Sequence, residues 1–82
     1  MERFHNLLLG LCESFGNKHG LTPRQIDTLY VLANGVTSNA AVSKELEIAL
    51  DTARNHLKSI YKRCKVSSKH EVLALLLKES LR

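Results

Sequence analysis

Half of the lysine and arginine residues of this 82-residue chain lie in one short segment. No acidic residue occurs between Asp51 and Glu71, so the full charges within this interval are all positive. A solvated protein surface usually mixes the two signs, whereas charge of one sign favours a polyanionic partner. The basic residues of the segment are Arg54, Lys58, Lys62, Arg63, Lys65 and Lys69.

The spacing within this segment predicts an amphipathic helix from Leu50 to about Lys65. At about 100° per residue, its apolar residues fall within one arc roughly 100° wide, and its basic residues fall on the adjoining arc. We therefore expect one flank to pack against a protein core and the other to contact something anionic. The apolar arc holds Ala53, Leu57, Ile60, Tyr61 and Cys64, and the basic arc holds Arg54, Asn55, Lys58, Lys62 and Lys65.

The composition of the chain limits the kind of fold that can hold this helix in place. The length predicts one small domain, and a hydrophobic fraction of 44% is sufficient for a globular fold. Four glycines and a single proline favour helices. A net charge of +4 and a pI near 9.3 are only modestly basic. The informative feature is therefore where the charge is concentrated, not its total.

Cysteine usage and hydropathy predict the compartment. Cys12 and Cys64 match no metal-binding spacing, and both fall on apolar helical stripes, which favours buried thiols in a reducing compartment over a disulfide. No signal-peptide pattern is present, and no stretch approaches the roughly 18 apolar residues that span a bilayer. We therefore expect a cytoplasmic protein.

Residues 2–15 are predicted to form an amphipathic helix, followed by a hinge at residues 16–20. This helix could cover part of the core, mediate dimerisation or continue a linker from an upstream domain, and the sequence leaves these alternatives open. Its apolar stripe is Phe4, Leu7, Leu8, Leu11, Cys12 and Phe15.

Two short helices are predicted before the basic helix. Thr22, Pro23 and Gln25 form a strong helix start with a capping box. A second helix over about residues 39–46 is joined to the basic helix by a tight turn at residues 47–49. Two short helices joined by about three residues, the second basic and amphipathic, are typical of a DNA-binding helix-turn-helix.

The last predicted helix covers about residues 69–80 and begins at a capping box formed by Ser68 and Glu71. The consecutive apolar residues 72–77 spread over two sides of this helix. One burial surface does not need so wide an arc, so we expect a two-fold partner on the second surface. Packing on the N-terminal helix alone is the alternative. The predicted dimer-interface residues are Val72, Leu73, Leu76 and Leu77.

A family resemblance lies in two stretches, LTPRQIDTLYVLANG and VSKELEIALDTARNHLKSIYKRCKVSSKHEVL. They resemble the LuxR/NarL-type (GerE-like) domain, which opens with Leu-Thr-x-Arg-Glu and reads Thr-Val-Lys/Arg-x-His in its recognition helix. Here these motifs occur at residues 21–25 and 52–56. The resemblance covers about residues 21–78. It implies a four-helix DNA-binding domain whose third helix enters the major groove and whose fourth, in many members, supplies the dimer contact.

The expected fold is therefore all-α: a LuxR-type helix-turn-helix domain over residues 21–82, preceded by an N-terminal amphipathic helix and hinge at residues 1–20. The chain carries no receiver or autoinducer-binding domain. We thus expect either a stand-alone regulator or an effector domain, like that of a response regulator, taken from a longer protein.

Departures from the family pattern concentrate in the turn before the basic helix. Gln25 replaces the usual Glu, and Glu47 and Ala49 replace the common Gly and Ser. A non-glycine residue in a left-handed turn costs roughly 1 kcal/mol. Because Ala49 has no side-chain acceptor, Asp51 or Thr52 is the expected cap of the basic helix.

The helical wheel and the resemblance both assign base contacts to Arg54, Asn55 and Lys58. Arg54 can donate two hydrogen bonds to guanine and Asn55 can bond adenine, each discriminating by about 1–3 kcal/mol. The basic residues farther along are expected to hold the DNA backbone, as are the amides at the start of the Thr22 helix. The resemblance adds Thr52 and His56. The predicted phosphate contacts are Thr22, Thr52, His56, Lys62, Arg63, Lys65 and Lys69.

Other function classes have less support. The histidines lie on separate predicted elements without metal-ligand spacing, and no phosphate loop or nucleophile–base pair is evident. We therefore predict no enzyme, cofactor, metal or small-molecule site. The competing function is a protein-interaction module that keeps the fold but binds another regulator or RNA polymerase through its last helix. Membrane-surface binding is disfavoured, because the core needs the apolar arc of the basic helix.

These predictions combine into a homodimer that binds double-stranded DNA and regulates transcription. Its two recognition helices would read half-sites about one DNA turn apart, roughly 34 Å. The prediction requires that Arg54 and Lys58 face solvent, and their burial would refute it.

Overall fold

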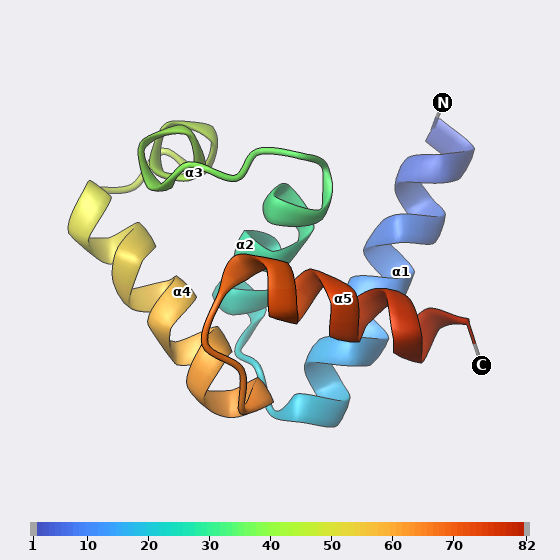
Figure 1. The fold of residues 1–82 in the computed structure, drawn as a ribbon. Helices are drawn as coiled ribbons and strands as arrows, with labels where there is room; N and C mark the ends of the chain where they lie inside the picture. The colour runs from blue at the N-terminus through green and yellow to red at the C-terminus, as the bar shows by residue number, and fades with distance from the viewer. Residues whose placement is uncertain (1, 82) are drawn as a thin grey trace.

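Five α-helices make up the part of the chain that the computed structural model describes, which is residues 2–81, with side chains from residue 7 onward (Figure 1). The side chain of Phe4, assigned above to the apolar stripe of the first helix, lies outside the described residues. The all-α class is confirmed. The helices are α1 (Glu2–His19), α2 (Pro23–Ala33), α3 (Asn39–Leu46), α4 (Leu50–Cys64) and α5 (Lys69–Ser80).

Helix α1 is longer than predicted, and the predicted hinge at residues 16–20 is wrong. The helix continues through Gly16 to His19 and ends at Gly20, which has a φ of +72°. A Cβ atom at Gly16 would overlap the side chain of Ile26 on α2. Gly16 therefore allows α1 and α2 to approach closely, and the left-handed conformation of Gly20 turns the chain.

Helix α2 lies at the centre of the fold, behind α5 in Figure 1, and contacts α1, α3 and α4. Its predicted capping box is confirmed. The Gln25 amide donates to Thr22 Oγ1 at 3.2 Å, and the Thr22 amide donates to Gln25 Oε1 at 3.0 Å. These reciprocal bonds satisfy two amides at the end of a helix.

One main core and one smaller core hold the helices together. The smaller core lies between α2, α3 and α4 and consists of Val31, Val42 and Ala53. The main core draws on α1, α2, α4 and α5, so α1 shares its core with the helices that follow it. Its buried residues are Cys12, Phe15, Leu21, Ile26, Leu29, Leu32, Leu57, Ile60, Cys64, Val72 and Leu76.

Cys12 and Cys64 are buried free thiols, as predicted. Burial, with a smaller effect of Glu13, raises the pKa of Cys12 to about 11. Burial, with a smaller effect of Glu79, raises the pKa of Cys64 to about 11. Both thiols therefore stay protonated at neutral pH and act as small apolar groups.

The turn between α3 and α4 adopts the predicted left-handed conformation at Glu47, with φ 56° and ψ 45°. Helix α4 begins at Leu50, and its N-cap is Ala49, which has no side-chain capping bond. The expectation that Asp51 or Thr52 caps this helix is therefore wrong. The Ala49 carbonyl already accepts from the Ala53 amide at 3.0 Å.

Two of the predicted dimer contacts belong to the core of a single chain, which corrects the sequence prediction. Val72 and Leu76 are buried among the helices of the same chain, so they present no surface to a partner. Leu73 is half-buried, and Leu77 is 61% exposed. The wide apolar arc of α5 therefore serves the main core on one side and leaves a narrower surface on the other.

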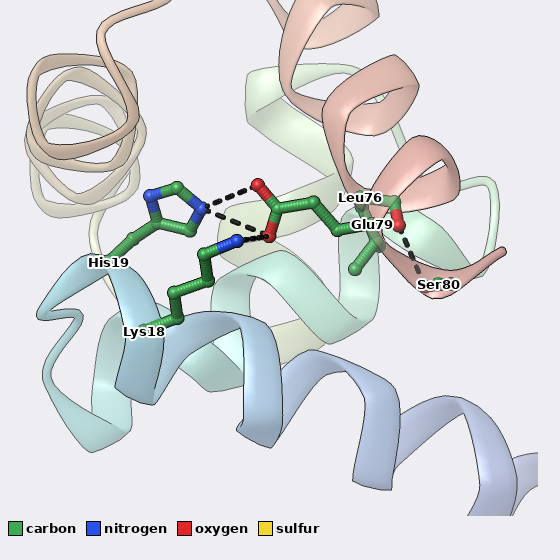
Figure 2. A network of polar contacts seen from close by, with 5 residues as sticks. All are labelled: Lys18, His19, Leu76, Glu79 and Ser80. Atoms are coloured by element: carbon green, nitrogen blue, oxygen red, sulfur yellow. Dashed lines mark hydrogen bonds and ion pairs between the residues drawn. The ribbon is translucent and has the colours of Figure 1, made fainter. Parts of the chain in front are cut away.

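Helices α1 and α5 are joined by three polar side chains, Lys18, His19 and Glu79, which we call the α1–α5 clasp (Figure 2). His19 Nε2 lies 3.2 and 3.1 Å from the two carboxylate oxygens of Glu79, and Lys18 Nζ lies 3.4 Å from Oε1. The His19 ring also packs against Phe15, with ring centroids 4.4 Å apart. The sequence did not suggest this contact, because its partners are 60 residues apart.

Candidate nucleic-acid interface

Helix α4 lies at the left edge of the molecule in Figure 1, with α3 above it and α5 beside its middle. The apolar flank is buried at Ala53, Leu57, Ile60 and Cys64, while Tyr61 is half-buried. Burial on one flank fixes the rotation of the helix about its own axis. The basic flank is thereby held outward.

The three predicted base-contact residues lie together on this outward flank. Arg54, Asn55 and Lys58 are all exposed, and the side chain of Arg54 is 53% exposed. The Arg54 guanidinium lies 3.7 Å from a carboxylate oxygen of Asp51, whose side chain is 89% exposed. An ion pair so open to water is weak, so Arg54 remains available to a ligand.

A surface groove of about 440 Å³ runs between α4 and the first residues of α3 and α5. We call it the α3–α4–α5 groove. Its cations are Arg54 and Lys58 on α4 and Lys69 at the start of α5, and no acidic residue lines it. The groove therefore concentrates positive charge from two helices. Its lining residues are Asn39, Arg54, Leu57, Lys58, Tyr61 and Lys69.

The other predicted phosphate contacts are spread over the surface. Lys62, Arg63 and Lys65 are exposed at the C-terminal end of α4. A Cβ atom at Gly20 would lie 3.4 Å from Arg63 Nη1, so Arg63 lies over the turn between α1 and α2 and not beside the groove. Lys65 ends the helix in a left-handed conformation, with a φ of 58°.

The three predicted phosphate contacts that are neither lysine nor arginine, Thr22, Thr52 and His56, have mixed surroundings. Thr52 is exposed and His56 is half-buried, both on α4. Thr22 is exposed, but its side-chain oxygen already caps α2. The structure thus gathers Arg54, Lys58 and Lys69 at one groove and leaves Thr22 and Arg63 outside its lining.

Sequence reasoning missed two residues of the groove, Asn39 and Tyr61. The Asn39 Oδ1 atom is buried and has no hydrogen-bond partner. Burial raises the pKa of Tyr61, so its hydroxyl stays protonated at neutral pH and can donate a hydrogen bond. A tyrosine at an apolar helical position was the available signal, because its ring can pack while its hydroxyl reaches a polar surface.

Within residues 2–81, no helix is long and apolar enough to cross a membrane. Over the same described residues, no group of three or more His, Cys, Asp or Glu side chains is placed to hold a metal ion.

A comparison with protein families matches residues 19–76 to the model described as bacterial regulatory proteins of the luxR family. No curated protein and no solved structure matched the chain. The matched residues run from the end of α1 into α5 and include all of α4 and the entire groove lining. Domains of this family are DNA-binding regulators and not enzymes. Because the match covers most of its length, the chain belongs to the luxR family of bacterial regulatory proteins, in which this domain binds DNA to regulate transcription.

Proposed function

We propose that the chain reads specific sequences in double-stranded DNA with the basic flank of α4 and regulates transcription as a homodimer. The observation that carries this proposal is the exposure of Arg54, Asn55 and Lys58 on one helix whose opposite flank is anchored in the core. A helix held in this way enters the DNA major groove, which is about 12 Å wide, without losing its own packing.

The basic flank divides into a reading part and a holding part. Arg54 and Asn55 lie in the first half of α4, where they can bond guanine and adenine edges. Lys62 and Lys65 lie at its C-terminal end, where they would contact phosphates without reading sequence. Helix α4 has 15 residues. It is therefore roughly 22 Å long, enough for both tasks.

Two alanine variants test this division. A preferred duplex is first selected from a random pool, and binding to it and to a scrambled duplex is measured by fluorescence anisotropy over a range of salt concentrations. Arg54→Ala should weaken binding to the preferred duplex by roughly 5- to 150-fold, and far less to the scrambled one. Lys62→Ala should weaken both by the same factor and reduce the slope of log K against log salt by about 0.9.

Lys78→Ala, which removes an exposed lysine from the far end of α5, is the matched control and should change neither binding constant. Equal losses on the two duplexes for Arg54→Ala and Lys62→Ala would contradict the division of roles. Absence of duplex binding by the unaltered chain would contradict the proposed function itself.

The proposed homodimer rests on the apolar surface that α5 leaves open. Leu73, Leu77 and Leu81 recur every four residues, and Leu77 and Leu81 are 61% and 77% exposed. Residues at this spacing lie on one side of a helix, and a self-complementary patch of this kind suits a two-fold partner. Leu73 and Leu77 are the two predicted interface residues that remain accessible.

Two leucines of nearly equal exposure can be used to test whether the dimer forms through α5 or through α1. Leu77 on α5 is 61% exposed, and Leu7 on α1 is 62% exposed. Molar mass measured by light scattering should fall to that of a monomer for Leu77→Lys and stay that of a dimer for Leu7→Lys. The reverse result would assign the interface to α1. A monomeric mass for the unaltered chain at all concentrations would contradict the dimer.

A protein-interaction module is the second candidate, favoured by the same exposed leucines. Combined Arg54→Ala and Lys58→Ala substitutions should abolish duplex retardation in a gel and, in cells, the regulation of a reporter gene. Regulation that survives these substitutions would favour a partner protein bound at α5 instead.

A further inference from the structure

The α3–α4–α5 groove has two ends along α4. Arg54 and Tyr61 are seven residues apart on this helix and therefore lie about 10 Å apart along its axis. Lys58 lies between them, and Lys69 enters from the first turn of α5. The Arg54 end adjoins the proposed base-reading residues. Among the described residues, Lys58 and Lys69 have no acidic partner within ion-pair distance.

Polar groups in this groove lack the partners that buried groups usually have. The Asn39 Oδ1 atom is an acceptor without a donor, and an unmet buried acceptor destabilises a fold. A lysine ammonium carries three donor hydrogens, so it can bond Asn39 and still donate to an anion. The Tyr61 hydroxyl supplies one further donor. A group with several acceptor oxygens and negative charge would therefore satisfy the lysine and tyrosine donors of the groove, whereas Asn39 Oδ1, itself an acceptor, would be satisfied by a lysine and not by that group.

We infer that the α3–α4–α5 groove seats one phosphate group, held by Lys58, Lys69 and the Tyr61 hydroxyl, with Asn39 positioning a lysine ammonium. The inference deepens the proposed function, on which it rests for the source of the phosphate, by naming three residues that hold the DNA backbone beside the base-reading end. It moves Lys58 from the base contact expected from the sequence to a backbone contact and leaves base reading to Arg54 and Asn55. A DNA strand and a free phosphate ester share this chemistry. The test has one arm for each source.

The first arm measures duplex binding by single variants. Lys69→Ala should weaken binding to the preferred and scrambled duplexes by the same factor and lower the salt slope by about 0.9, whereas the control Lys78→Ala should do neither. Tyr61→Phe keeps the ring in place and should cause a smaller loss of affinity, again by the same factor for both duplexes. Asn39→Asp adds a carboxylate to the groove and should also weaken both complexes. Its fold should persist, because Asp is favourable in the first turn of a helix.

The second arm titrates the free chain with inorganic phosphate and follows backbone amide resonances by NMR. A phosphate seat that acts without DNA predicts saturable shifts at the amides of Asn39 and Lys69, which Asn39→Asp should abolish. If these shifts are seen and Lys69→Ala does not change duplex binding, the ligand of the groove is a free phosphate ester. If the variants weaken binding to both duplexes equally and inorganic phosphate causes no such shifts, the ligand of the groove is the DNA backbone.

The inference is overturned if Lys69→Ala behaves like Lys78→Ala on both duplexes and inorganic phosphate shifts neither amide. This failure is distinct from failure of the proposed function. If the unaltered chain binds no duplex but inorganic phosphate shifts the groove amides in a saturable manner, the phosphate seat stands and the DNA-reading function does not.

Discussion

The α1–α5 clasp and the α3–α4–α5 groove both bring cations to a place where distant helices meet, but they treat the charge differently. In the clasp, Lys18 and His19 face the carboxylate of Glu79, and the side chains of His19 and Glu79 are each less than one-fifth exposed. In the groove, Arg54, Lys58 and Lys69 face no carboxylate among the lining residues. Arg54 does have an acidic partner in Asp51, at 3.7 Å, but the Asp51 side chain is 89% exposed and does not line the groove.

This difference indicates which charges hold the fold and which are available to a ligand. Charges that leave water must be paired within the protein, or their desolvation destabilises the fold. Cations that stay exposed and unpaired keep a positive potential that attracts an anion. Charge pairing therefore supports the proposed binding surface more specifically than the modest net charge of +4 does.

Charge reversal in the groove should have the largest effect. Lys58→Glu is expected to weaken binding to the preferred duplex by roughly 10- to 100-fold, because it removes a contact and repels the DNA. The free energy of unfolding should change by less than about 0.5 kcal/mol, because the side chain is exposed. Anisotropy titration and urea denaturation measure the two quantities. Lys78→Glu is the matched reversal, and an equal loss of affinity in that variant would mean that net charge alone drives binding.

Neutralising the clasp should produce the opposite pattern. Glu79→Gln removes the carboxylate that is hydrogen-bonded to His19 and ion-paired with Lys18, so the free energy of unfolding should fall by about 1–2 kcal/mol. Duplex affinity should stay within about twofold of the unaltered chain, because the clasp adds no lining residue to the groove. Urea denaturation is the measurement, with Glu13→Gln as the exposed control on α1. Unchanged stability in Glu79→Gln would show that the clasp is incidental.

The pH dependence of stability should show a smaller effect of the same contact. Burial acts to raise the pKa of Glu79, but hydrogen bonds and charges from His19 and Lys18 outweigh it, so the net pKa lies below the ordinary value. A carboxyl with a lowered folded-state pKa stabilises the fold above its unfolded pKa, about 4.3, and loses this contribution as the pH falls through the folded value.

The stability difference between the unaltered chain and Glu79→Gln should therefore shrink below about pH 4. Urea denaturation at a series of pH values gives this difference. Other acids that titrate in the same range, such as Glu71, are present in both proteins and cancel. A difference that does not change down to pH 3 would contradict the lowered pKa.

Local sequence signals predicted the last four helices closely. Thr22 and Gln25 are three residues apart and bond each other, and Ser68 caps α5 through the Glu71 amide at 3.2 Å. One detail was not predicted, since the Glu71 carboxylate also accepts from the Ser67 amide at 2.9 Å. Capping pairs of this kind can be predicted from the sequence because both partners lie within one helical turn.

Predictions that depended on distant contacts were less successful. A glycine at position 16 suggested a hinge, but it lies inside α1, where it permits contact with Ile26. Val72 and Leu76 suited a partner surface equally well in the sequence, and only the placement of α1, α2 and α4 around α5 shows that they are core residues. Helical periodicity specifies which residues share a side, but not what that side faces.

Periodicity and capping act within a few residues along the chain, so they were enough to predict the helices and the common flank of Arg54, Asn55 and Lys58. The packing of the helices was needed to show that Lys18 and His19 meet a carboxylate while Lys58 and Lys69 line an open groove with Asn39 and Tyr61. Electrostatic pairing depends on distance through space, and that distance is set by how the five helices pack.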